Sequence, residues 1–249
     1  SGRYEFKNKG IDVYLEALAR LNAVEGLKRN VLAFVNVPGW EGEARQDLKE
    51  RMESKEQFTT PLDFPMLTHE LHDRNNDNVL RTLATCGMWN TTDHKVKVIF
   101  IPHYQDGQDG ILNMHYYDLI LGNDLSVYPS YYEPWGYTPL ESVAFAVPTI
   151  TTDLAGFGLW ANSVKGSESE IEDGVKVIHR SDYNFDEVAN AICDTVVSYS
   201  EKTDKEKQNI RKKAGALAKK ALWSEFITYY YMAYEEAFAK AQLRQANKN

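Results

Sequence analysis

The fold of this chain is decided by the segment Leu125-Ser-Val-Tyr-Pro-Ser-Tyr-Tyr-Glu-Pro-Trp-Gly-Tyr-Thr-Pro-Leu-Glu141. Its first four residues predict a buried strand, and Thr138 to Ala146 predicts a helix, so a polar and aromatic loop follows the strand. Thr138, Pro139 and Glu141 have the form of a capping box with Thr138 as the N-cap. A helix that begins there directs free backbone N–H groups toward the carboxyl edge of a sheet, where a pyrophosphate can bind.

Strands and helices alternate on both sides of this segment. The predicted strands are 31–37, 96–101, 125–128, 149–151 and 175–178, and the predicted helices are 11–22, 78–85, 117–121, 138–146, 185–199 and 205 to about 244. This alternation predicts an α/β fold with a doubly wound, Rossmann-like parallel sheet. We expect one domain over residues 1–249, with a charged insertion near 40–64 and a helical tail near 203–244.

The composition is that of a globular protein with one substantial core. The 249 residues are 43% hydrophobic and 26% charged, and 36 Asp and Glu against 28 Lys and Arg give a net charge of -8. Because the excess is acidic, we expect no nucleic-acid partner. No apolar run reaches the roughly 18 residues of a membrane span, so we expect no membrane partner. Cys86 and Cys193 lack metal-ligand spacing and are interpreted as buried free thiols of a cytoplasmic protein.

Four aromatic rings surround one carboxylate in the loop. Tyr131, Tyr132, Trp135 and Tyr137 are close in sequence to Glu133. Aromatic rings pack against the C–H faces of sugars and a carboxylate accepts hydrogen bonds from hydroxyls, so the combination predicts a carbohydrate site. The alternative is ordinary packing, because rings near a turn commonly belong to a core and a capping box alone occurs at many helix starts.

The stretch Ser130-Tyr-Tyr-Glu-Pro-Trp-Gly-Tyr-Thr-Pro139 resembles the signature of the animal and fungal glycogen synthases, which are family 3 retaining glycosyltransferases. The residues 1–10, 68–69, 96–100 and 148–158 agree with that family in the same order, and the similarity is weakest from Trp40 to Phe64. The resemblance implies the C-terminal, donor-binding half of a two-domain GT-B enzyme. The N-terminal acceptor domain is expected to be absent from this chain.

The resemblance also implies roles for individual residues. The implied catalytic residues are Glu133, beside the transferred glucose, and Arg3 and Lys9, which neutralise the departing diphosphate. The implied nucleotide- and sugar-binding residues are Arg3, Lys9, Tyr116, Trp135, Gly136, Thr138 and Glu141. Tyr116 would stack on the base, and Glu141 is either a ribose ligand or a capping residue. Without the resemblance, Arg3 and Lys9 would be interpreted as solvated surface charges.

The implied activity is the transfer of glucose, with retention, from UDP-glucose or ADP-glucose to the non-reducing end of an α-1,4-glucan. The resemblance implies no metal and no other cofactor. The implied partners are the nucleotide sugar, the glucan and the missing N-terminal domain; the related enzymes are tetramers, and a homo-oligomer is left open here. Without its acceptor half, the isolated chain is expected to be inactive. The alternative function is a nucleotide- or glucan-binding domain without turnover, and sucrose synthase is a weaker alternative.

Three other features are interpreted as structural. The segment Asp73 to Asn78 lacks the glycine and glutamate of a calcium loop and predicts a helix-capping turn. His69 is interpreted as a hydrogen-bonded structural histidine. The basic residues of 211–220 fall where related enzymes carry an arginine-rich helix that binds glucose 6-phosphate. Lysine offers a point charge, whereas arginine binds phosphate through two donors of its planar guanidinium. We therefore favour a solvated helix face over a phosphate site.

Overall fold

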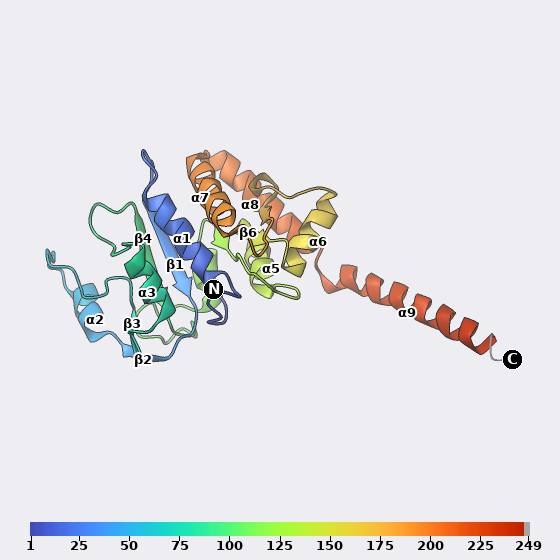
Figure 1. Cartoon of the computed structure of the whole chain (residues 1–249), viewed down its shortest axis with the longest axis horizontal. Helices are drawn as coiled ribbons and strands as arrows, with labels where there is room; N and C mark the ends of the chain where they lie inside the picture. Colours follow the sequence, from blue (N-terminus) through green and yellow to red (C-terminus); the bar gives the residue numbers. More distant parts are fainter. Residues whose placement is uncertain (247–249) are drawn as a thin grey trace.

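The computed structural model describes residues 1–246 of the chain (Figure 1). The strands are β1 (Val31–Asn36), β2 (Glu41–Ala44), β3 (His69–Leu71), β4 (Val96–Ile101), β5 (Ser126–Val127), β6 (Thr149–Thr152) and β7 (Val175–Ile178). The helices are α1 (Ile11–Asn22), α2 (Gln46–Glu53), α3 (Asn78–Thr85), α4 (Tyr116–Leu121), α5 (Tyr137–Ala144), α6 (Gly156–Lys165), α7 (Phe185–Glu201), α8 (Asp204–Lys219) and α9 (Trp223–Ala246), with a 3-10 turn at Ile171–Asp173. None of the helices within residues 1–246 is long and apolar enough to cross a membrane.

The predicted α/β fold with parallel strands is confirmed. β1 pairs with β4 in one parallel sheet, and β5, β6 and β7 form a second parallel sheet. β2 and β3 form a separate antiparallel pair. In the described part of the chain, β1 and β5 do not pair, and their facing edges border the cavity described below.

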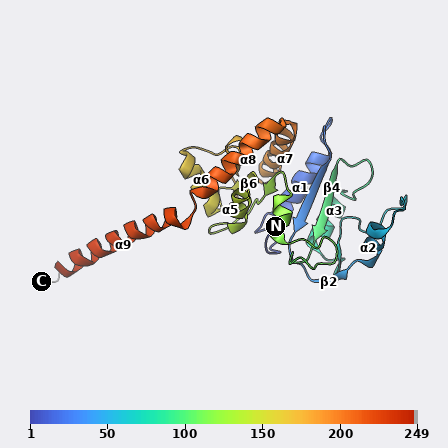
Figure 2. The same cartoon turned by 180° about the vertical axis from the view of Figure 1, so that it is seen from behind.

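α1 joins the two parallel sheets because it is apolar on two faces. Ile11, Leu15 and Leu18 pack into the core over β1 and β4, with α3. Val13 and Ala17 pack into a second core with β6 and α7. The helical period of 3.6 residues places these two sets on different faces. Figures 1 and 2 show α1 close to α7, between the two halves of the body.

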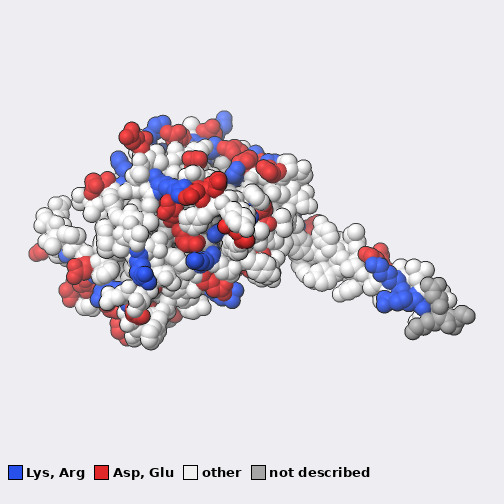
Figure 3. Space-filling model, viewed as in Figure 1, with Lys and Arg blue, Asp and Glu red and all other residues white. Residues whose placement is uncertain are grey.

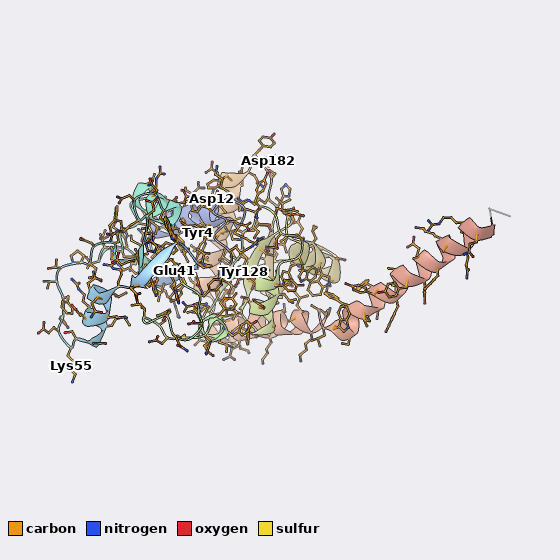
Figure 4. All side chains as sticks on the ribbon, turned by 90° about the horizontal axis from the view of Figure 1, so that it is seen from below. Tyr4, Asp12, Glu41, Lys55, Tyr128 and Asp182 are labelled. Atoms are coloured by element: carbon orange, nitrogen blue, oxygen red, sulfur yellow. The ribbon has the colours of Figure 1, made fainter. Side chains whose placement is uncertain are left out.

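The charged segment after β1 forms β2, α2 and the approach to β3. No residue of α2 is buried, and Figure 4 places Lys55 at the far end of this segment, away from the body. One charge is buried: Arg45 is 2% exposed and donates to the carbonyl oxygens of Phe64 (2.8 Å) and Leu67 (3.2 Å). These bonds attach the segment to the end of the loop that follows α2.

The predicted long C-terminal helix is divided into α8 and α9. α8 packs against α5, with Ala214 close to Gly174. Gly174 has φ 94°, and a Cβ atom there would lie 2.4 Å from the Ala214 nitrogen, so glycine permits this close approach. α9 extends away from the body in Figures 1 and 2, and none of the residues from Trp223 to Ala246 is buried.

Candidate active site

A cavity of about 540 Å³ opens at the carboxyl ends of β1, β4 and β5. It continues between the facing edges of β1 and β5, where Leu32, Phe34, Leu125 and Val127 form an apolar wall. Its polar mouth is bordered by the start of the chain, the start of α1 and the start of α5. The carboxyl edge of parallel strands is where open α/β sheets bind ligands, so this cavity is the candidate site.

The mouth of the cavity holds an ion pair between Lys9 and Glu133. The Lys9 side chain is 15% exposed and the Glu133 side chain 22% exposed, so both charges are largely removed from water. The backbone of Glu133 is also fixed, because its N–H donates to the Leu154 carbonyl (3.3 Å) and its carbonyl accepts from the Gly156 N–H (3.1 Å). The loop after β6 therefore fixes the backbone of the residue that carries the carboxylate.

Five of the predicted site residues line this one cavity: Arg3, Lys9, Tyr116, Glu133 and Thr138. Arg3 is exposed and pairs with Glu5 at 2.8 Å. The other three predicted residues, Trp135, Gly136 and Glu141, are outside the cavity lining in the described structure. Gly136 nevertheless directly precedes α5, whose first residues, Tyr137 and Thr138, border the cavity.

Comparison with known proteins identifies the family. The model of the glycogen synthase family matches residues 41–248. The chain belongs to the glycogen synthase family. It is 28% identical to glycogen [starch] synthase isoform 1 of Saccharomyces cerevisiae, covering 98% of this chain and 43% of the yeast protein. It is 27% identical to the liver glycogen [starch] synthase of Rattus norvegicus, covering 97% of this chain and 41% of the rat protein. The chain thus spans less than half the length of these curated relatives.

Solved structures show the same fold at low sequence identity. The α,α-trehalose 6-phosphate synthase of Burkholderia multivorans is 11% identical with a TM-score of 0.54, covering 98% of this chain and 43% of that one. The N-terminal domain of the Candida albicans trehalose-6-phosphate phosphatase is 13% identical with a TM-score of 0.55, covering 93% and 40%. These similarities agree with the expected GT-B glycosyltransferase fold of the glycogen synthase family.

Of two adjacent tyrosines in this glycogen synthase family member, only Tyr116 reaches the cavity. Its hydroxyl lies 2.9 Å from the Ser1 hydroxyl, and burial raises the pKa of the Tyr116 phenol. Tyr117 is exposed and donates to Glu141 Oε1 at 3.2 Å, and the negative charge of Glu141 raises the pKa of Tyr117. Tyr116 is therefore the one of these two tyrosines whose side chain borders the cavity.

The predicted capping box at the start of α5 is wrong. The N-cap is Gly136 instead of Thr138, and no side chain caps the helix. Gly136 has φ 108° and ψ 81°, a backbone conformation that glycine adopts readily, and this turn starts the helix earlier than Thr138 would. The N–H groups of Tyr137 and Thr138 find no acceptor within residues 1–246, so they stay free at the cavity mouth.

We define the signature loop as residues 129–136. Its aromatic residues and those at the start of α5 have different surroundings. The Trp135 ring packs against Phe157, Trp160 and Phe226, with centroid distances of 6.2, 5.7 and 5.4 Å. It therefore belongs to a hydrophobic cluster, and the expectation that all four rings gather around Glu133 is wrong. Tyr137 borders the cavity and is 73% exposed, so its ring is accessible to a ligand.

Sequence reasoning missed His103, which borders the cavity and stacks on His69. The two rings are 5.0 Å apart and nearly parallel, at 8°. The His69 nitrogens lie 2.9 Å from Thr68 Oγ1 and 2.8 Å from the Asp109 carbonyl oxygen, and burial lowers the pKa of His69. His69 is thus the hydrogen-bonded structural histidine that was predicted. The pair of histidines could not be found from sequence spacing, because His103 follows β4 on a separate segment.

Two other predictions for polar segments can be compared with the structure. Asp77 caps α3 by accepting a hydrogen bond from the Leu80 N–H at 2.9 Å, so the predicted capping turn is confirmed. The solvated basic face of α8 is only partly correct. Arg211 donates to the Asn123 carbonyl at 3.2 Å, and Lys213 donates to the Glu172 carbonyl at 2.8 Å. These two side chains attach α8 to the body.

Proposed function

We propose that this chain is the donor-binding half of a retaining glucosyltransferase that extends an α-1,4-glucan in glycogen synthesis. The single observation that carries the proposal is the Lys9–Glu133 ion pair at the mouth of a cavity that Arg3, Tyr116 and Thr138 also line. A cavity of about 540 Å³ is within the usual size of a small-molecule site. The membership in the glycogen synthase family supports this choice of reaction.

The proposed donor is UDP-glucose or ADP-glucose. We propose that its base contacts the Tyr116 ring, that its diphosphate lies near Arg3, Lys9 and the free N–H groups of α5, and that its glucose lies beside Glu133. Gly136 and the Trp135 backbone would contact glucose hydroxyls, and Glu141 would accept from the ribose after releasing Tyr117. Two side-chain cations and a helix N-terminus supply the positive charge that the leaving diphosphate requires, so the proposal includes no metal ion.

The proposed role of Glu133 is electrostatic. Retention by double displacement requires a carboxylate that attacks the sugar carbon. The Lys9 ammonium bonds Oε2 of Glu133, so this oxygen is not free to attack the sugar carbon, whereas the carboxylate keeps its negative charge. We therefore propose that Glu133 orients the glucose and stabilises its positive charge. The bond from C1 to the phosphate oxygen breaks, the bond from C1 to the acceptor 4-oxygen forms, and the acceptor proton moves to the departing phosphate.

The proposed partner of the chain is the acceptor domain of the same protein. The chain covers 43% of the yeast relative and 41% of the rat relative, so more than half of each relative is outside the match. Residues 226–234 of α9 carry no charged side chain. Five large side chains of this stretch are exposed: Tyr229, Tyr230, Tyr231, Met232 and Tyr234. Figure 3 shows this uncharged stretch next to the body. We propose that α9 packs against the acceptor domain in the cytoplasm.

The test is glucosyl transfer by the full-length protein that contains this chain. We expect incorporation of labelled glucose from UDP-glucose or ADP-glucose into a glucan primer. Glu133→Gln should lower turnover by about 100-fold or more, because the carboxylate charge acts on the transition state. Glu16→Gln is the control, since Glu16 pairs with Arg20 on α1 outside the cavity lining. Donor binding without transfer would instead support the alternative of a binding domain.

A further inference from the structure

Arg180 is a buried cation that lies behind the signature loop. Its side chain is 5% exposed, and it follows β7 directly after His179. Nη1 donates to the Pro129 carbonyl oxygen at the start of the loop. The guanidinium carbon lies 5.3 Å from the centroid of the Tyr131 ring. The Arg180 side chain is outside the cavity lining in the described structure, so it is not placed to contact the donor.

The same arginine also faces the first turn of α1. Arg180 Nη2 lies 4.0 Å from Asp12 Oδ1. Figure 4 labels Asp12, which lies on α1, and Tyr128, which directly follows β5; both lie within the body of the chain. Arg180 therefore faces both segments of the candidate site: the first turn of α1, which directly follows Lys9 and Gly10, and the loop, which carries Glu133.

The segment before α1 and the signature loop approach each other closely at Gly10. A Cβ atom at Gly10 would lie 2.0 Å from the Pro129 carbonyl oxygen and 2.7 Å from Arg180 Nη1. A second link lies next to it, because the Tyr131 N–H donates to the Asn8 carbonyl at 2.8 Å. Asn8 and Gly10 flank Lys9 in the sequence. The position of Lys9 relative to Glu133 thus depends on how residues 8–10 sit against residues 129–131.

Stability alone does not explain a charge at this position. The guanidinium is buried, its carboxylate partner is at the limit of ion-pair distance, and burial lowers the pKa of Arg180. Replacing buried ionic groups by apolar side chains of similar volume is often neutral or stabilising. The planar guanidinium of an arginine, in contrast, can donate to a carbonyl, stack on an aromatic ring and face a carboxylate at the same time.

We propose that Arg180 is a positioning residue that holds the first turn of α1 against the signature loop and so fixes Lys9 opposite Glu133. It acts through these two residues and does not touch the donor. Its consequence for donor binding rests on the proposed function, whereas its consequence for the conformation of the two segments does not.

The first experiment measures backbone hydrogen exchange in the whole chain. Arg180→Met should speed exchange in residues 8–12 and 129–133, and Arg180→Lys should give an intermediate increase, because one ammonium can still donate to the Pro129 carbonyl. The matched control is Arg45→Met, which removes another buried arginine that donates to two carbonyls. The control should leave both segments unchanged. Equal exchange in Arg180→Lys and the unsubstituted chain would overturn the proposal. This comparison does not use Arg180→Met, so it still tests the proposal if that variant does not fold.

The second experiment measures the affinity of the chain for UDP-glucose by calorimetry. Arg180→Met should weaken binding by about tenfold to a hundredfold, as expected when a charged ligand contact is misplaced. In a Lys9→Met background, the same substitution should have little further effect, because the residue through which it acts is gone. Fully additive losses would contradict the proposal. If the unsubstituted chain binds no nucleotide, the proposed function fails, and hydrogen exchange still decides the role of Arg180.

Discussion

At the scale of single residues, the candidate site depends on a glycine that permits contact between two segments. Gly10 is the N-cap of α1 with φ 67°, and any Cβ atom would overlap the Pro129 carbonyl oxygen at 2.0 Å. Gly26 also has a positive φ, 76°, but a Cβ atom there would meet nothing within 4 Å. The two positions therefore separate the cost of the backbone conformation from the cost of the collision.

Gly10→Ala should lower the free energy of unfolding by roughly 3 kcal/mol, and Gly26→Ala by roughly 1 kcal/mol. The smaller value is the cost of a left-handed backbone alone, and the difference is the cost of displacing the loop at Pro129. Urea unfolding followed by circular dichroism gives both numbers. Equal losses in the two variants would show that the contact between residue 10 and the loop is not close.

His69 makes the free energy of unfolding depend on pH, and its burial determines the sign of this dependence. The pKa of His69 is lowered from 6.5 in the folded chain, so the unfolded chain takes up the proton first as the pH falls. The contribution of His69 to stability is fully present above about pH 6.5 and decreases as the pH falls below it, until the folded pKa is passed. In urea unfolding between pH 7.5 and 5, His69→Gln should lose less stability than the unsubstituted chain. The same pH slope in both chains would contradict this account.

At the scale of elements, periodicity and turn residues predict most strands and helices, but they do not predict α6. Gly156 and Gly158 at its start suggest a loop in the sequence. In the structure they permit close packing: a Cβ atom at Gly156 would lie 2.3 Å from the Pro134 carbonyl oxygen, and one at Gly158 would lie 2.1 Å from that of Thr152. Glycines needed for contact between segments look like helix breakers when only the neighbouring residues are considered.

The same reason limits what the sequence predicts of the site. The resemblance indicates Glu133 and Lys9 separately, but these residues are 124 positions apart and no local pattern predicts that they pair. The Arg180 contacts are equally distant in sequence. The capping box at Thr138 fails because Gly136, two positions earlier, starts the helix. Local patterns therefore predict elements, whereas contacts between distant segments decide which side chains face the cavity.

α6 is attached to the signature loop by the aromatic cluster. The Trp160 ring lies 5.7 Å from each of the Trp135, Phe157 and Phe226 rings, measured between centroids. Trp160→Ala should lower the free energy of unfolding by about 2–3 kcal/mol, somewhat less than for a fully buried tryptophan. The neighbouring Leu159 is 57% exposed, so Leu159→Ala should cost less than about 0.5 kcal/mol. Similar costs in chemical denaturation would rule out a cluster that includes Trp160.

At the scale of the whole molecule, α9 is attached to the body only at its start within the described residues 1–246. Phe226 reaches the Trp135 ring, and Figures 1 and 2 show the rest of the helix extending away from the body. Removing residues 230–249 should therefore change the free energy of unfolding of the body by less than about 0.5 kcal/mol. Thermal and urea unfolding of the shortened chain measure this change. A large loss of stability would show that α9 folds back onto the body in solution.

The central claim is that the cavity beside Lys9 and Glu133 binds the diphosphate of a nucleotide sugar. The most direct measurement is calorimetric titration of UDP, ADP, UDP-glucose and ADP-glucose into the chain. We expect at least one glucose conjugate to bind at one site per chain, with about tenfold or greater weakening in Lys9→Met and Arg3→Ala, because each removes a cation from the diphosphate. Lys7→Met, an exposed lysine outside the cavity lining, should bind as the unsubstituted chain does. No binding by any of the four nucleotides, or equal weakening in Lys7→Met and Lys9→Met, would contradict the claim.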